Sequence, residues 1–498
     1  MDFAIHQIFL ESRNTDLDPL RQVAERNRYF RWLTARTQRS TFAEKPDQSP
    51  PEALLQQVWL YQRLAQDRLQ TTDGRAVRVL HPGFWNKEPG PDFRKAVVQI
   101  GAAPAVIGDV EIDLVPAGWE RHSHARNPAY QDVVLHVTWE PETAPAGLPS
   151  ISLKHALDST VPELSFWLGV EPKPSPAGLA GQCSGPLRLL AAAEVAQVLR
   201  QAAETRLLRK AELIQARARQ LGWEGALWEA MFGALGYKRN VWPMRRLGIL
   251  LPALTKDVRA EVSFVLQARL LGVASLLPLQ LPPGAPRDYI RRVWDLWWRE
   301  AEAFRDLQLP PGVWNLAGIR PANHPQRRLA VGAHWAAHSE IPKELDRWIE
   351  RSIESPDLVA SLSKIVQVRH DDFWSYRWTL KSAPFREAQP LLGEQRITDL
   401  AINVILPWLY VRALAGRNEK LSNAAEQRYM LWPPGEDNSV LKLARQRLFG
   451  GASGRILQTA AQQQGLMQIV RDFCDHSDAL CTHCQFPEML RNLQSSGR

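Results

Sequence analysis

The period of the apolar positions divides the chain into two parts. Between residues 75 and 156, short runs rich in β-branched residues are separated by turn signals, a pattern typical of strands. These runs are RAVRVLHPG, RKAVVQIG, AVIGDVEIDL, DVVLHVTWE and a weaker SISLKHA. After about residue 185, apolar residues recur at helical spacing, and AAAEVAQVLRQAAETRLLRKAELIQARARQL indicates one long helix or two. The pattern predicts a small α/β region followed by a larger helical one.

Three segments follow from this division, because 498 residues are too many for one core. Residues 1–48 are expected to form an N-terminal helical arm and linker, with one helix around Leu20 to Thr37. Residues 49–185 should form the α/β domain, which opens with a helical pattern over 52–69. Residues 186–498 should form an all-α domain that ends in a cysteine-rich loop.

Acidic residues stand out in the predicted strands. Asp92 begins one strand, and Glu111 and Asp113 lie in the next. Residues two apart on a strand point to one face, while Val110 and Ile112 point to the opposite, apolar face. Buried carboxylates are costly unless a cation compensates them, and their oxygens are preferred ligands of Mg²⁺ and Mn²⁺. We therefore expect such a metal at Asp92, Glu111 and Asp113; the alternative is a strand whose acids face water.

This arrangement resembles the PD-(D/E)XK nuclease fold. The pattern of that fold is a helix with Glu, a strand, a strand opening with Pro-Asp, a strand with Glu-x-Lys, and then a helix and further strands. Here Glu52 opens the helix, Pro91-Asp92 gives the first signature, and Glu111-Ile112-Asp113 stands in place of Glu-x-Lys. The resemblance implies a restriction-endonuclease-like core. It also implies metal-dependent cleavage of phosphodiester bonds, with Glu52 orienting water or a second metal.

The chain departs from that pattern at one position. Asp113 replaces the lysine that positions or activates the water, and Lys87, Lys95 or His136 would have to substitute for it. If one of them converges on the carboxylates, we expect a metal-dependent nuclease or phosphodiesterase. If none does, we expect a non-catalytic nucleic-acid-binding or assembly protein that retains the fold.

Three histidines lie close in sequence to these acids. His122 and His124 form an HxH motif, and His136 lies inside the apolar run VVLHVTW. Imidazole transfers protons near neutral pH, so His124 or His136 is a candidate general base. The alternative is a hydrogen-bonded histidine in the core.

The four cysteines of the chain form a ligand-like pattern. Cys474, Cys481 and Cys484 give C-x6-C-x2-C, and Cys183 is the only other thiol. Thiolates in this number select zinc or an iron–sulfur cluster of the 4Fe–4S type, and a neighbouring histidine could replace one zinc ligand. Buried free thiols are the alternative.

The charge of the chain permits a polyanionic partner without requiring one. The net charge is +8, and residues 200 to 260 hold twelve Lys and Arg against five acids, Arg217, Arg219 and Lys238 among them. We expect a surface for DNA or RNA; the alternative is ordinary solvated helix faces.

The start of the chain, MDFAIHQIFLESRNTD, lacks the pattern of a signal peptide. No run approaches the ~20 apolar residues of a membrane span. A cytoplasmic location is expected, where thiols stay reduced.

Several segments in combination resemble a bacterial family, domain of unknown function 2851. They are LLQQVWLYQRL, HPGFWNKEPGPDF, GDVEIDL, GWERHSHARNPAYQDVVLHV, RLLRKAELI, RPANHPQRRLA and the closing cysteine motif. The resemblance runs from about residue 52 to 487. It implies the domain layout given above and no activity.

Overall fold

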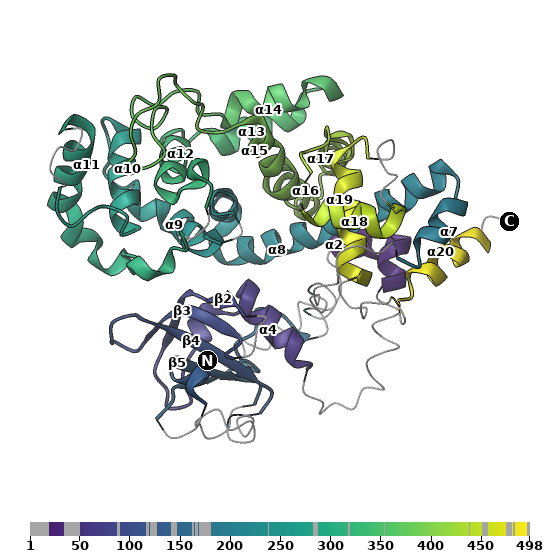
Figure 1. The fold of residues 1–498 in the computed structure, drawn as a ribbon, viewed down its shortest axis with the longest axis horizontal. Helices are drawn as coiled ribbons and strands as arrows, with labels where there is room; N and C mark the ends of the chain where they lie inside the picture. The colour runs from purple at the N-terminus through teal and green to yellow at the C-terminus, as the bar shows by residue number, and fades with distance from the viewer. Residues whose placement is uncertain are drawn as a thin grey trace.

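A computed structural model describes most of the chain. The described residues are 19–33, 50–86, 90–115, 119, 127–140, 147–161, 164, 168, 181–237, 239–281, 287–316, 319–352, 354–437, 439–450, 457–474, 481 and 484–495. A mixed β-sheet with one helix forms the N-terminal part, and helices form nearly all of the rest (Figure 1). The predicted succession of an α/β region and a larger helical region is confirmed.

Among the described residues, the main elements of the α/β region are helix α4 and a sheet. Helix α4 runs from Glu52 to Tyr61 and buries Leu54, Leu55 and Val58 in the apolar core that it shares with the strands. The strands are β1 (Val77–His81), β2 (Phe84–Trp85), β3 (Phe93–Ile100), β4 (Val106–Asp113), β5 (Val133–Thr138) and β6 (Ser150–Ser152). Each predicted run contains a strand. Strand β2 escaped prediction because two residues are too few to show a period.

The sheet has both antiparallel and parallel pairs. Its order is β1-β3-β4-β5-β6, with β2 paired to β3. Strand β3 is antiparallel to β1 and β4, whereas β4 and β5 are parallel. Phe93 pairs with Val110, and Glu111 pairs with His136. Because paired residues share a face, the register brings His136 beside the acidic positions of β4.

Helices dominate from residue 184 onward. They are α7 (Ser184–Leu189), α8 (Ala192–Leu235), α9 (Val241–Leu254), α10 (Val262–Val273), α11 (Arg287–Glu300), α12 (Pro325–Ala337), α13 (Ile341–Glu350), α14 (Leu358–Val366), α15 (Glu394–Leu400), α16 (Leu406–Ala415), α17 (Glu419–Leu431), α18 (Ser439–Phe449), α19 (Ala460–Ile469) and α20 (Phe486–Ser495). Helix α8 breaks at Gly222, where φ is 73°. Only glycine adopts this conformation without strain, so α8 is two segments joined at that residue. The predicted pattern, residues 191–221, lies in the first segment and forms one helix.

The N-terminal arm packs on the helical region. Helix α2 (Pro19–Arg26) buries Leu20 and Ala24 in the large helical core. Tyr29 donates a hydrogen bond to Asp472 Oδ2 at 2.9 Å. Figure 1 shows α2, in purple, beside the C-terminal helices α18 and α19. The described part of the N-terminal arm therefore packs against the C-terminal helices.

One continuous helical segment, Glu394–Ala415, is long and apolar enough to cross a membrane. The sequence pattern did not predict such a segment. Its most apolar window is 72% buried inside the protein, as expected of a core helix.

Candidate active site

The acids of β4 lie on a buried face of the sheet. Glu111 is 7% exposed and Asp113 is 4% exposed. Val110 and Ile112, which alternate with them, are buried in the sheet's apolar core. The strand thus separates an acidic face from an apolar one, as its period-two pattern predicts.

Asp92 and Glu111 are held together by the backbone of β3 and β4. The Asp92 N–H donates to Glu111 Oε2 at 3.0 Å, and the Ile112 N–H donates to Asp92 Oδ2 at 3.1 Å. Helix α4 contributes Gln56, whose Nε2 donates to Asp92 Oδ1 at 2.9 Å and to Glu52 Oε1 at 3.3 Å. Three of the predicted site residues therefore converge from helix α4, from the residue before β3 and from strand β4.

Sequence reasoning missed Gln56, although its position was informative. It lies one helical turn after Glu52, so the two side chains share a helix face.

The neighbouring carboxyls oppose one another's ionisation. Burial, followed by the charge of Glu52, raises the pKa of Asp92 to about 7, although hydrogen bonds from Ile112 and Gln56 lower it. Burial, followed by the charge of Asp92, raises the pKa of Glu111 to about 9. Near neutral pH this cluster either retains protons or requires a compensating cation.

His136 joins the acidic cluster from β5. Its Nε2 lies 3.0 Å from Asp113 Oδ2, and the side chain is 0% exposed. Its Nδ1 has no hydrogen-bond partner among the described residues. The centroid of the Trp119 ring lies 5.5 Å from the centroid of the His136 ring. Burial and the charges of the nearby carboxyls, Glu111 first, raise the pKa of Tyr130 to about 12, so Tyr130 also borders the cluster.

The candidates for replacing the motif lysine differ in position. Lys95 lies at a bulge in β3 with φ 57°, and its N–H donates to Asp109 Oδ1 at 3.0 Å. Its side chain lines a shallow cavity with Asp109 and Asp132. His136, by contrast, converges on the acidic cluster. Lys87, His122 and His124 lie outside the described residues.

The donor set suits a hard cation, although the side chains are not closed around one. Asp92, Glu111 and Asp113 offer carboxylate oxygens. Within the described ranges, no three His, Cys, Asp or Glu side chains form a group able to hold a metal ion. Binding would therefore require at least one carboxylate to move toward the others.

The four cysteines, all described by the structure, lie near one another where the arm and the C-terminal helices pack, although no three of them form a group able to hold a metal ion. Cys183 and Cys474 are buried in one apolar cluster, and Cys484 packs against it. Burial, followed by the charges of Cys484 and Cys481, raises the pKa of Cys183 to about 12. Burial and the other thiols, Cys183 first, also raise the pKa of Cys474. The thiols are thus close enough to interact electrostatically across nearly three hundred residues of sequence.

Part of the basic excess in residues 200–260 is internal. Arg206 donates to Gln464 Oε1 at 2.6 Å, Arg209 pairs with Asp472 at 2.8 Å, and Lys210 donates to Asn403 Oδ1 at 2.7 Å. These cations are half-buried and join α8 to residues 401–405 and to the C-terminal helical segment. Lys238 lies outside the described residues.

Comparison with known proteins gives a family and no activity. No curated protein and no solved structure matches the chain. Residues 52–439, which include the acidic cluster and most of the helical region, match the family described as "Protein of unknown function (DUF2851)", and the protein therefore belongs to that family.

Proposed function

We propose that the acidic face of the sheet is the active site of a metal-dependent nuclease or phosphodiesterase. The observation that supports this most is the mutual destabilisation of Asp92 and Glu111, whose pKa values are raised to about 7 and about 9 by burial and neighbouring acids. A fold gains nothing from burying like charges together. A divalent cation would convert this cost into binding energy, and strongly shifted groups cluster at functional sites.

The order of the elements supports the PD-(D/E)XK interpretation. Glu52 begins α4, Asp92 immediately precedes β3, and Glu111 lies in the adjoining β4. The following strand, β5, is parallel to β4 and carries His136. The acids of the motif thus follow one another along the chain in the order of the resemblance, although two strands, β1 and β2, lie between α4 and β3.

Each residue of the cluster has a distinct proposed role. Asp92 and Glu111 would hold Mg²⁺ or Mn²⁺, with Asp113 in support and Glu52 orienting water or a second metal. When bound, the metal polarises the phosphate and lowers the pKa of its water. His136 is too buried to reach a substrate, so it acts by holding Asp113 in position through their 3.0 Å contact. His124 stays the candidate for proton transfer.

Metal binding and hydrolysis test this proposal together. Calorimetry should show Mn²⁺ binding that Asp92→Asn and Glu111→Gln each weaken at least about tenfold, or roughly 1.4 kcal/mol. The wild-type protein should hydrolyse bis(4-nitrophenyl) phosphate with Mn²⁺. Glu111→Gln should reduce kcat/KM about a hundredfold or more, because several kcal/mol of transition-state stabilisation are lost.

Glu140→Gln is the matched control. It removes a carboxylate of the same region that pairs with Lys154 at 2.8 Å, and both activities should survive it. Equal Mn²⁺ binding by the wild type and all three variants would refute the metal site. Mn²⁺ binding without hydrolysis would favour the alternative, a non-catalytic nucleic-acid-binding or assembly protein.

A further inference from the structure

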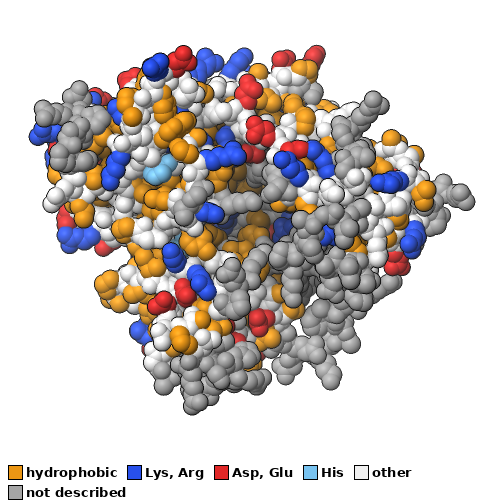
Figure 2. Space-filling model, in the orientation of Figure 1, with side chains coloured by type: hydrophobic (Ala, Val, Ile, Leu, Met, Phe, Trp, Pro, Cys, Tyr) orange, Lys and Arg blue, Asp and Glu red, His pale blue; other side chains and the backbone are white. Residues whose placement is uncertain are grey.

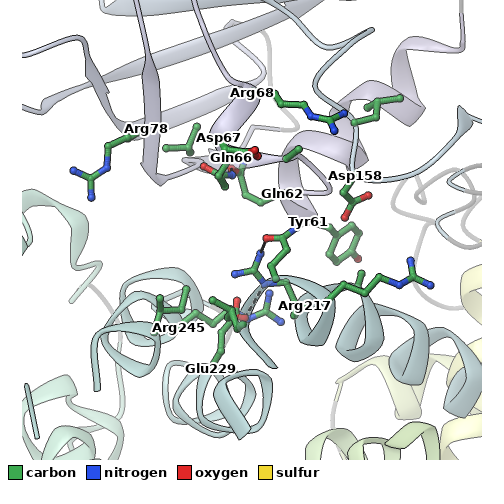
Figure 3. A pocket seen from close by; sticks show the side chains of 18 of the residues that line it. Tyr61, Gln62, Gln66, Asp67, Arg68, Arg78, Asp158, Arg217, Glu229 and Arg245 are labelled. Carbon is green, nitrogen blue, oxygen red and sulfur yellow. Dashed lines mark hydrogen bonds and ion pairs between the residues drawn. The ribbon is translucent and has the colours of Figure 1, made fainter. Parts of the chain in front are cut away.

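A cleft of about 940 Å³ separates the sheet region from the helical region. One wall comes from β1 and the segment after α4, and the other comes from α8 and α9. Figure 3 shows Arg68 and Arg78 on one side of the open space and Arg217 and Arg245 on the other. The arginines that line the cleft among the described residues are Arg68, Arg78, Arg217, Arg219, Arg245 and Arg246. Both walls are therefore basic.

Three acids line the cleft among the described residues, Asp67, Asp158 and Glu229, and the last two already have partners. Asp158 pairs with Arg63 at 2.8 Å, and Arg63 lies outside the cleft lining. Glu229 pairs with Arg217 at 2.7 Å. Because these carboxylates are engaged, they leave much of the cleft's positive charge uncompensated.

Arg245 and Arg246 of α9 carry the clearest surplus of positive charge. Neither makes a hydrogen bond or ion pair with another described residue, and Arg245 Nε is buried without a partner. Burial lowers the pKa of Arg246, and the charge of Arg78 on the opposite wall lowers it further. Guanidinium groups that repel each other across a cleft favour an anion between them.

We propose that this cleft binds the phosphate backbone of single-stranded nucleic acid. Its volume is at the upper end of the ~300–1,000 Å³ of small-molecule sites, and cations on both walls suit several phosphates rather than one. Arginine forks match phosphate oxygens. Trp242 and Tyr61 also line the cleft and offer aromatic faces to unpaired bases. A double-stranded nucleic acid would contact only the mouth of the cleft.

Helix α4 connects the cleft with the acidic face. Glu52 begins the helix at the acidic cluster, and Tyr61 ends it at the cleft. Nine steps of 1.5 Å give roughly 14 Å between them, a distance that a few nucleotides span. Figure 2 shows basic side chains along the boundary between the two regions. The inference deepens the proposed function, and rests on it in one respect: the bound strand is the substrate.

Fluorescence anisotropy with a labelled twelve-nucleotide single strand tests the cleft directly. In EDTA and low salt, the Arg245→Gln/Arg246→Gln double variant should bind at least tenfold more weakly than the wild type. The slope of log affinity against log salt should fall by about 1.4, or ~0.7 for each lost phosphate contact. Arg78→Gln, at an exposed position on the other wall, should weaken binding without disturbing the fold.

Arg291→Gln/Arg292→Gln is the matched control. It removes two adjacent arginines from the exposed face of α11, where their side chains are 67% and 57% exposed. The strand should bind this variant within about twofold of the wild type. Equal losses in both double variants would mean that net charge alone drives binding. Displacement of the strand by inorganic tripolyphosphate at equal phosphate concentration, or tighter binding of a duplex, would also overturn the inference.

The two proposals can fail separately. Strand binding is measured without metal, whereas hydrolysis of bis(4-nitrophenyl) phosphate needs no strand. Binding at the cleft without Mn²⁺-dependent hydrolysis would reject only the proposed activity. If the wild type hydrolyses bis(4-nitrophenyl) phosphate but binds the single strand no better than the Arg245→Gln/Arg246→Gln variant does, only the proposal about the cleft is rejected.

Discussion

Two buried acidic sites of this protein have opposite surroundings. Asp472, in the helical region, accepts hydrogen bonds from Tyr29 at 2.9 Å, Arg209 at 2.8 Å and Gln468 at 2.9 Å. Glu111, in the sheet, has other carboxyls as its main electrostatic neighbours. Both side chains are largely buried, so burial alone does not distinguish them.

The difference lies in what compensates the charge. Donors from three parts of the chain surround Asp472, and such a network stabilises one arrangement of the helices. The acidic face has a locally unfavourable arrangement, which natural sequences retain mainly at functional sites. The comparison therefore predicts opposite effects on stability when the two charges are removed.

The thiol cluster extends the comparison and should give the largest effect. Like the acids, Cys183 and Cys474 are buried beside groups of the same kind, the other thiols, and these would repel one another if ionised. We propose that zinc or an iron–sulfur cluster binds the four thiolates. Because such a site exists only in the native state, binding energy becomes folding energy. Cys481→Ser should cost roughly 5 kcal/mol or more and lower solubility, as measured by thermal melting.

Cys481→Ala separates ligand loss from ordinary packing. A buried thiol without metal should tolerate alanine better than serine, because serine buries a hydroxyl. If Cys481 is a ligand, both variants should be equally unstable. Elemental analysis of anaerobically purified protein should show zinc or iron at near one site per chain. A folded, cooperatively melting wild type with neither metal would identify the cysteines as ordinary thiols.

Asp472→Asn should give the next largest effect. It leaves the Arg209 guanidinium without its partner, and breaking a buried pair costs about 3 kcal/mol. Urea unfolding should show this loss. Asp295→Asn is the control, since Asp295 lies 3.8 Å from Arg291 in a largely exposed pair. That change should cost less than about 0.5 kcal/mol. Similar losses in both variants would show that burial and donor geometry matter less than the comparison assumes.

Local patterns predicted the strands and the acidic face well. The period of AVIGDVEIDL predicted that Glu111 and Asp113 share a face, and β4 confirms it. The place of His136 beside Asp113 could not be predicted, because it depends on the parallel register of β4 and β5. Counting charges along the sequence also did not show where each basic side chain lies in the fold. Lys210 and Arg246 look alike in sequence, yet one donates to Gln464 inside the helical region and the other lines the cleft.

Contacts between distant segments lay beyond sequence reasoning. Tyr29 and Asp472 are 443 residues apart, and only the packing of α2 on the C-terminal helices brings them together. The cysteine pattern did point to one such proximity, that of Cys183 to the C-terminal thiols, because a reactive side chain that recurs at ligand spacing has few other uses. The metal site itself stays a prediction.

Removing the charge of Glu111 should have the smallest effect and the opposite sign. The pKa of Glu111 is raised by burial and then by Asp92 from its ordinary 4.5 to about 9. Between these values the folded protein holds a proton that the unfolded chain releases, so stability falls as pH rises through this window. In EDTA, Glu111→Gln should therefore raise the free energy of unfolding at pH 8 by about 1–2 kcal/mol, and change it little at pH 4. Urea unfolding at several pH values would measure this gain.

Glu140→Gln should show no comparable rise in the free energy of unfolding. Saturating Mn²⁺ should reverse the order, because the metal stabilises only a native state that retains its ligand. If the Glu111→Gln variant is less stable than the wild type at pH 8 in EDTA, the prediction is wrong. Glu111 would then be a compensated charge that stabilises the fold, as Asp472 is.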